Sequence, residues 1–221
     1  MTADDADAMK LSLLVALVST FVVCIPGVPL AWLTVRKSFI GRGLLITLLT
    51  LPLVLPPTVT GYLLLEIVGR GKPLGRWLES SFGLVLVFHW TGAVLASAVT
   101  SFPLFFLSAR TAFAAIDTQY EQLARMLGAS EPGVFRRVTL PLALPGLVAG
   151  ALLSFVRASG DFGATLMVAG NIPGRTRTAA LALYDATILG NAAQARGLVA
   201  LLSVLAMAAL WLSSRITRKS A

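Results

Sequence analysis

Long apolar segments alternate with short polar ones along most of the chain. Five of the apolar segments approach or exceed the roughly 20 residues that a helix needs to cross a hydrocarbon core of about 30 Å. We place these spans at 11–35, 44–68, 83–109, 138–158 and 195–214. Their length and continuity predict an all-α integral membrane protein built as a bundle of five transmembrane helices.

A sixth span over residues 162–184 is the alternative. This stretch is apolar at both ends but is interrupted by Asn-Ile-Pro-Gly-Arg-Thr-Arg at 171–177. The Pro-Gly pair is a strong turn signal, and the apolar stretch 178–188 is too short to cross a membrane. We therefore expect two short pieces joined by a turn, the second of them a re-entrant or interfacial helix, and five spans rather than six.

Prolines interrupt two of the predicted spans. Pro26 and Pro29 lie in the first span, and Pro52, Pro56 and Pro57 lie in the second. Proline removes a backbone donor, so we expect kinks at these positions, tolerated where neighbouring helices satisfy the freed carbonyls.

Composition excludes a soluble globular domain. The chain is 57% hydrophobic and only 13% charged, whereas soluble domains carry about 25% charged residues. Its 221 residues accommodate five or six crossings with short loops, so we treat 1–221 as a single transmembrane domain. The net charge of +8 comes from basic residues scattered among loops, which favours membrane lipid over nucleic acid as a partner.

No set of residues suited to catalysis or metal binding is found in the sequence. His89 is the single histidine and adjoins Trp90, where an interfacial anchor is expected, and the single cysteine, Cys24, lies within an apolar run. The phosphate-binding pattern Gly-x-x-x-x-Gly-Lys-Ser/Thr is also missing. We expect no enzyme activity, no metal and no cofactor on this chain, with any ATP used by another polypeptide.

The polar island at 120–141 separates two apolar segments and is the most informative stretch of the sequence. Residues 117–127 favour a short helix, and Gly128 can adopt the left-handed conformation that ends it. Ser130 and the Glu-Pro pair that follows it are typical of the start of a second helix. The predicted structure is a helix, a sharp turn and a helix.

The first helix of the island has an apolar face, because its apolar residues recur at spacings of three and four. These residues are Tyr120, Leu123, Ala124 and Leu127. Gln122, Arg125 and the turn at Gly128 remain available on another face. A projection of this kind fits a cleft on a soluble partner. The alternative is a polar connector whose amphipathic face lies on lipid headgroups.

The spacing of the island resembles the cytoplasmic EAA loop of ABC importer permeases. Gln122-Leu123-Ala124 precedes Gly128 at the family distance, and Val-Thr-Leu-Pro at 138–141 opens the next apolar run. The resemblance implies an ATPase-coupling loop over about 110–138. The residues it implies are Glu121, Gln122, Leu123, Ala124, Arg125, Leu127, Gly128 and Ala129.

The island departs from the commonest form of this loop at its first two positions. That form has Glu-Ala-Ala where this chain has Gln122-Leu123-Ala124, and an acidic residue, Glu121, stands one position earlier. These differences bear on individual contacts with the partner more than on docking itself.

Three further segments extend the resemblance over nearly the whole chain, to the molybdate permeases among the type I, MetI-like ABC importer permeases. They lie at 51–62, 71–78 and 159–178, the last containing Ser-Gly-Asp-Phe-Gly-Ala-Thr-Leu. Sulfate and thiosulfate permeases share the Gly-acidic-Phe-Gly-Ala element and are the alternative. Asn-Ile-Pro-Gly-Arg-Thr at 171–176 and Pro-Pro-Thr-Val-Thr-Gly-Tyr at 56–62 favour molybdate or tungstate.

An oxyanion path needs hydrogen-bond donors rather than a deep trap. The candidate path residues are Thr58, Thr60, Asp161, Gly163 and Thr165. A carboxylate repels an anion, so we expect Asp161 to have a structural role, paired with Arg157 one helical turn earlier. A gating contact is the alternative. Asp161 also replaces the Glu that is usual at this position in the family.

The resemblance implies partners. These are a second copy of the chain, two ABC ATP-binding subunits that use ATP and Mg²⁺, and an extracytoplasmic oxyanion-binding protein. A channel, a secondary transporter or a membrane scaffold remain the alternatives from other classes.

Orientation is weakly determined, because the 18 Lys and Arg residues divide almost evenly between the two sides. The predicted loop and the basic C-terminal tail favour a cytoplasmic C-terminus and an outer N-terminus in the inner membrane.

Overall fold

The computed structural model describes residues 3–218, and every regular element in that range is a helix. In chain order these are α1 (Ala3–Arg36), α2 (Arg42–Val54), α3 (Pro57–Val68), α4 (Pro73–Phe82), α5 (Trp90–Ala114), α6 (Thr118–Met126), α7 (Glu131–Val134), the π-helix η1 (Phe135–Thr139), α8 (Leu140–Ser159), α9 (Gly163–Ala169), α10 (Ala179–Ile188) and α11 (Ala192–Arg218). The predicted all-α class is confirmed.

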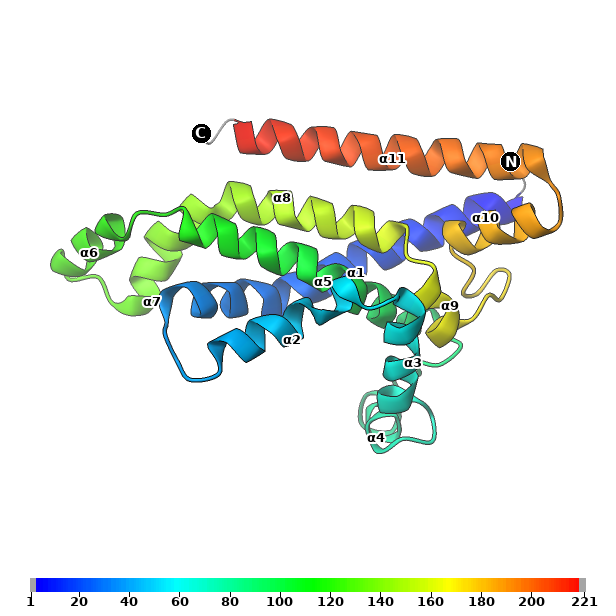
Figure 1. The fold of residues 1–221 in the computed structure, drawn as a ribbon, viewed down its shortest axis with the longest axis horizontal. Coiled ribbons are helices and arrows are strands. Elements are labelled where there is room, and N and C mark those ends of the chain that lie inside the picture. Colours follow the sequence, from blue (N-terminus) through cyan, green and yellow to red (C-terminus); the bar gives the residue numbers. More distant parts are fainter. Residues whose placement is uncertain (1–2, 219–221) are drawn as a thin grey trace.

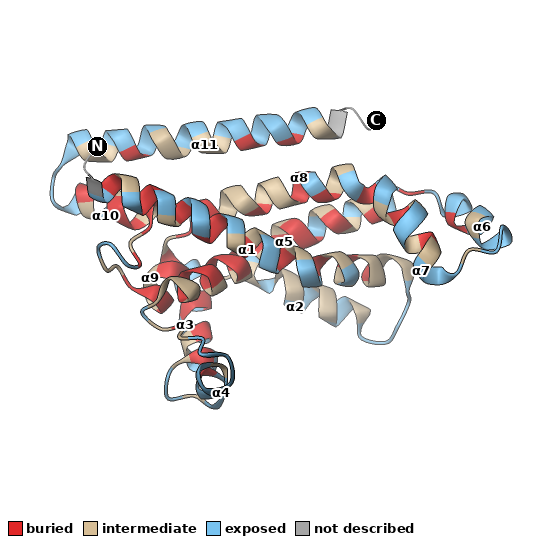
Figure 2. Cartoon of the chain, turned by 180° about the vertical axis from the view of Figure 1, so that it is seen from behind, coloured by how far each residue is buried: buried red, intermediate tan, exposed pale blue. Residues whose placement is uncertain are grey.

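The bundle is assembled around α5, which lies between α1 and α8 and also contacts α2 and α9 (Figure 1). Its inward residues belong to the main apolar cluster, where Phe105, Phe106 and Phe113 are almost completely buried. In contrast to α5, α11 is exposed along most of its length (Figure 2). It packs mainly against α8 and α10. The core therefore sits at α5, and α11 lies at the edge.

Within residues 3–218, four helices are long and apolar enough to span a membrane: Asp4–Arg36, Trp90–Ala114, Glu131–Ser159 and Ala192–Ile216. The predicted total of five is reached only if the bent pair α2 and α3 counts as one span. The first of the four continues as a helix through Pro26 and Pro29.

The predicted span at 44–68 is broken at its prolines into α2 and α3, and the bend of 118° between them is much sharper than a kink within one helix. Leu55, between them, is extended, with φ −68° and ψ 140°. A residue before proline is pushed out of the helical region, and two consecutive prolines follow here, so the helix must stop and restart. As a result α3 leaves the bundle at a steep angle and carries α4 away from it (Figure 1).

The third predicted span begins later than expected. Residues 83–89 are apolar but not helical, and α5 starts at Trp90. Gly83 ends α4 with φ +64°, and the His89 ring accepts a hydrogen bond from the Thr91 amide at the start of α5. Hydropathy cannot register this boundary, because the loop side chains are as apolar as those of a span.

The interrupted segment at 162–184 folds as two short helices joined by a turn, as predicted. Gly170 ends α9 at φ +70°, and Gly174 provides the turn at φ +69°. Both α9 and α10 are shorter than a membrane crossing.

Two glycines on α8 let it approach α5 closely. A Cβ on Gly146 would lie 2.5 Å from Ala112 Cβ, and one on Gly150 would lie 2.8 Å from Ser108 Cβ. Such distances are closer than any real contact, so the helices could not keep this separation with a larger residue.

Gly146→Ala should therefore destabilise the bundle by about 1–3 kcal/mol, the usual cost of overpacking. Thermal unfolding of the purified protein in detergent measures the effect. Gly197→Ala is the matched control, because nothing lies within 4 Å of a Cβ built there and alanine favours a helix. Equal stability of the two variants would show that the approach of α8 to α5 is not tight.

Candidate functional site

The polar island folds as the predicted helix, turn and helix. Asp117 caps α6 by accepting a hydrogen bond of 2.9 Å from the Gln119 amide. Gly128 then adopts φ +84°, and α7 begins after Ser130 with a proline in its first turn. Figure 1 shows this loop projecting from one end of the bundle.

The apolar face of α6 points away from the protein. Tyr120 and Leu123 are more than half exposed, and Met126 and Leu127 are 83% and 88% exposed. Gln122 is also exposed, and Ala124 and Ala129 are half-buried. Sequence reasoning did not include Met126, which joins Leu127 at the tip. Apolar side chains this exposed at a projecting tip mark an interaction surface.

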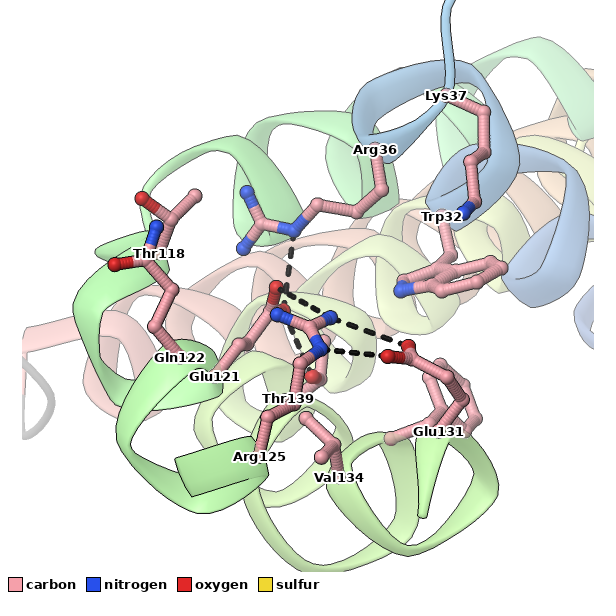
Figure 3. Close-up of a pocket in the computed structure, with 11 residues that line it drawn as sticks. Trp32, Arg36, Lys37, Thr118, Glu121, Gln122, Arg125, Glu131, Val134 and Thr139 are labelled. Atoms are coloured by element: carbon pink, nitrogen blue, oxygen red, sulfur yellow. Dashed lines mark hydrogen bonds and ion pairs between the residues drawn. The ribbon is translucent and has the colours of Figure 1, made fainter. Parts of the chain in front are cut away.

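Glu121 differs from the other predicted loop residues, because it is 4% exposed. Helical periodicity turns it away from Leu123 and toward the bundle. Its Oε1 accepts a hydrogen bond of 3.1 Å from Arg36 Nε and one of 2.8 Å from Thr139 Oγ1 (Figure 3). Glu121 therefore belongs to the interior of the loop and not to its outer surface.

A polar cavity of about 250 Å³ lies between the end of α1 and the loop. On its outer side Arg125 binds Glu131 through two hydrogen bonds, Nε to Oε1 at 2.6 Å and Nη2 to Oε2 at 3.2 Å. The hydrogen bond to Glu131 raises the pKa of the Arg125 guanidinium above its usual value. The pair closes the turn by joining α6 to α7 (Figure 3).

An aromatic layer underlies this cavity and joins the loop to the bundle. Phe135 of η1 packs edge-on against Trp32 of α1, with ring centroids 5.5 Å apart, and lies 6.4 Å from the Phe113 ring of α5. The π-helical turn that holds Phe135 leads without a break into α8. Turns of this kind are rare and are frequent at functional sites.

The second group of predicted residues surrounds Asp161, between α8 and α9. The predicted ion pair with Arg157 is confirmed, with Arg157 Nη1 3.3 Å from Asp161 Oδ1. Thr100 of α5 donates to the same oxygen, and Thr165 donates to Oδ2 through both its amide and its hydroxyl. Asp161 is 2% exposed, so this network fixes the start of α9 against α5.

The remaining path candidates lie where α3 meets α9. A Cβ on Gly163 would come within 3.1 Å of Pro57 Cβ and 3.2 Å of Thr58 Cγ2, so the absence of a side chain permits the contact. Thr58 is exposed, whereas Thr60 is buried and its hydroxyl lies 3.5 Å from the Pro56 carbonyl oxygen. The Thr165 hydroxyl already donates to Asp161. That these residues line a path stays a prediction.

Several residues of both sites were missed from the sequence. Arg36 and Thr139 complete the Glu121 network, and Thr100 completes that of Asp161. Each is an ordinary residue at a distant position, and no local spacing marks it. Within residues 3–218 no group of three or more His, Cys, Asp or Glu side chains is placed to hold a metal ion.

Residues 27–219 match the family model of the binding-protein-dependent transport system inner membrane component. The chain belongs to this family. The permease is 43% identical to the molybdenum transport system permease protein ModB of Escherichia coli (strain K12), covering 100% of this chain and 96% of that protein. It is 36% identical to ModB of Azotobacter vinelandii, covering 97% and 96%.

Solved structures share the fold of the permease. A chain of the MetNI methionine ABC transporter in an inward-facing conformation superimposes with a TM-score of 0.70 at 18% identity, over 100% of both chains. A chain of a bacterial ABC transporter that imports alginate gives 0.74 at 15% identity, over 99% of this chain and 80% of that one. The predicted type I ABC importer fold is confirmed.

Asp161→Asn should destabilise the permease by about 2 kcal/mol or more, because it removes a buried charge that accepts charge-assisted hydrogen bonds and leaves Arg157 unpaired. Thermal unfolding in detergent measures the loss. Asp7→Asn is the control, since Asp7 is exposed and forms a surface ion pair with Lys10. A stable Asp161→Asn variant with altered oxyanion preference would contradict a structural role.

Proposed function

We propose that this chain is the permease subunit of an ATP-driven importer of molybdate. The assignment of molybdate as the substrate rests on the 43% identity to ModB over the whole chain. Tungstate, a tetrahedral dianion of the same form, would share the route. Sulfate is the competing cargo, because the Gly-Asp-Phe-Gly-Ala element at 160–164 is also found in sulfate permeases.

The projecting loop is the site at which we place energy coupling. Its exposed tip, formed by Met126 and Leu127 on α6 and its end, supports docking into a cleft of an ATP-binding subunit. ATP and Mg²⁺ would be bound there and not by this chain. Two copies of the permease would enclose the path, each docked on one ATP-binding subunit.

Transport then requires two states that the partners bind differently. Closure of the ATP-binding subunits would draw the two loops together and rock the helices from inward-facing to outward-facing. An extracytoplasmic oxyanion-binding protein would then deliver the anion. The Asp161–Arg157 ion pair fits this scheme, because the guanidinium offsets the carboxylate charge that would otherwise repel the cargo.

We propose an inner-membrane orientation in which the loop and the C-terminus are cytoplasmic and the N-terminus is outside. Figure 1 supports placing the loop and the C-terminus on one side and the N-terminus on the other. The end of α11 lies toward the end of the bundle that carries α6, and α1 starts at the opposite end. The docking role then fixes the side, because ATP-binding subunits work in the cytoplasm.

Cells that lack their own molybdate importer, and express this chain with its ATP-binding and binding-protein partners, should accumulate molybdate in an ATP-dependent manner. Tungstate should compete at equal concentration, whereas sulfate should not. Equal competition by sulfate would identify a sulfate permease instead. Uptake that persists after ATP depletion would indicate a channel or secondary transporter.

Gly128→Val should insert normally but lose binding-protein-stimulated ATPase activity in the complex. Valine at φ +84° costs on the order of 1–2 kcal/mol and redirects α7. Nothing lies within 4 Å of a Cβ at this position, so the effect comes from the backbone alone. Gly128→Asn, which tolerates the left-handed region, should retain activity. Wild-type transport by the valine variant would show that this turn is not needed.

A further inference from the structure

We propose that Glu121 is a positioning residue for energy coupling, tying the docking helix α6 to the ends of two transmembrane segments. Through Arg36 it holds the last residue of α1, and through Thr139 it holds the π-helical start of α8. The inference rests on the proposed coupling function of the loop and adds the route by which its movement reaches the membrane helices.

Three parts of the chain meet at this one carboxylate. Arg36 lies 85 residues before Glu121 and Thr139 lies 18 residues after it, yet both donate to the same oxygen, Oε1. Arg36 also donates from Nη2 to the Ile116 carbonyl oxygen at 3.1 Å, which fixes the connection between α5 and α6. The root of the loop is thus bound to α1 and to η1 (Figure 3).

The apolar side chains of α6 cannot provide this connection. Leu123 and Met126 point outward and are exposed, so they are directed at the partner rather than at the bundle. Within residues 3–218, the side-chain hydrogen bonds and ion pairs that join α6 to α1 or η1 all pass through Glu121. The carboxylate therefore makes the directional link between α6 and these segments.

Burial makes this link stiff. The side chains of Glu121 and Arg36 are 5% and 13% exposed, so water competes poorly for either charge. Removing one partner of such a pair leaves the other charge buried and unsatisfied. The neighbouring Arg125–Glu131 pair is 40% and 62% exposed and joins α6 only to α7, and exposed pairs contribute little.

The two faces of α6 make docking and transmission separable. Leu123 on the outer face serves contact with the partner, and Glu121 on the inner face serves contact with the spans. A change confined to Glu121 should leave the docking surface intact while loosening its connection to the membrane helices. ATP would then be hydrolysed without moving the membrane helices. Coupling requires that the docking surface and the transport path both act on the same rigid helices.

The test is Glu121→Gln in the intact complex with ATP-binding subunits and binding protein, reconstituted in liposomes. Molybdate uptake and ATP hydrolysis are measured together. Glutamine still accepts from Thr139 but cannot pair with Arg36 as an ion. We expect the ATP-binding subunits to remain bound and hydrolysis to continue, while uptake per ATP falls about tenfold. Glu131→Gln, on the exposed side of the loop, should keep the wild-type ratio.

Thr139 provides a second variant pair that leaves both charges in place. Thr139→Val keeps the shape but removes the donor and should lower uptake per ATP, whereas Thr139→Ser should keep it. A wild-type ratio in both Glu121→Gln and Thr139→Val would overturn the inference. Loss of the ATP-binding subunits from either variant would also overturn it, by assigning these residues to docking or folding.

Failure of the proposed function gives a different result. If the wild-type complex takes up sulfate instead of molybdate, the ratio is measured with sulfate and the role of Glu121 is still tested. If the wild-type complex shows no ATP-dependent uptake of either anion, the proposed function fails for wild type and variants alike.

Discussion

A membrane chain can interrupt its helices only where the protein itself satisfies the freed backbone groups. In this permease several interruptions gather around one short helix, α9. Phe88, in the loop before α5, donates from its amide to the Val168 carbonyl oxygen. Gly163 packs on the first turn of α3, and Asp161 binds the Thr165 amide at the start of α9. Because α9 packs against α5, these interrupted segments lie against the buried core of the bundle and not against lipid. The order of the whole bundle depends on that arrangement.

Local signals in the sequence were sufficient for the helix-turn-helix of the loop and for the Arg157–Asp161 pair, since glycine, proline and a spacing of four act within a few residues. Pairings across the chain were not predictable, because Arg36 and Glu121 are 85 residues apart and neither is unusual alone. Hydropathy also failed at residues 83–89, because an apolar loop has the same hydropathy as a span. At Leu55 the following prolines indicated a kink, but they could not predict a bend of 118°.

The two polar networks serve different ends of the molecule by the same means. Each places one carboxylate among donors from separated segments. Glu121, beside the projecting loop, accepts from Arg36 of α1 and Thr139 of η1. Asp161, beside the broken helices, accepts from Thr100 of α5, Arg157 of α8 and Thr165 of α9. In each case the arginine is more exposed than the acid, so the cation retains part of its hydration while the anion is satisfied by fixed donors. Such an arrangement specifies one packing of the surrounding helices, which nonspecific apolar contacts alone do not.

The exposed tip of α6 has a consequence for the cell. Met126 and Leu127 present nearly bare apolar side chains, and exposed apolar surface of this kind promotes aggregation when it is left uncovered. An orphan copy of this chain would carry that liability for as long as it stays unassembled. The side chains that favour docking therefore also limit how much of this chain a cell can hold unassembled. The chain and the partner that covers its tip must be made in matched amounts.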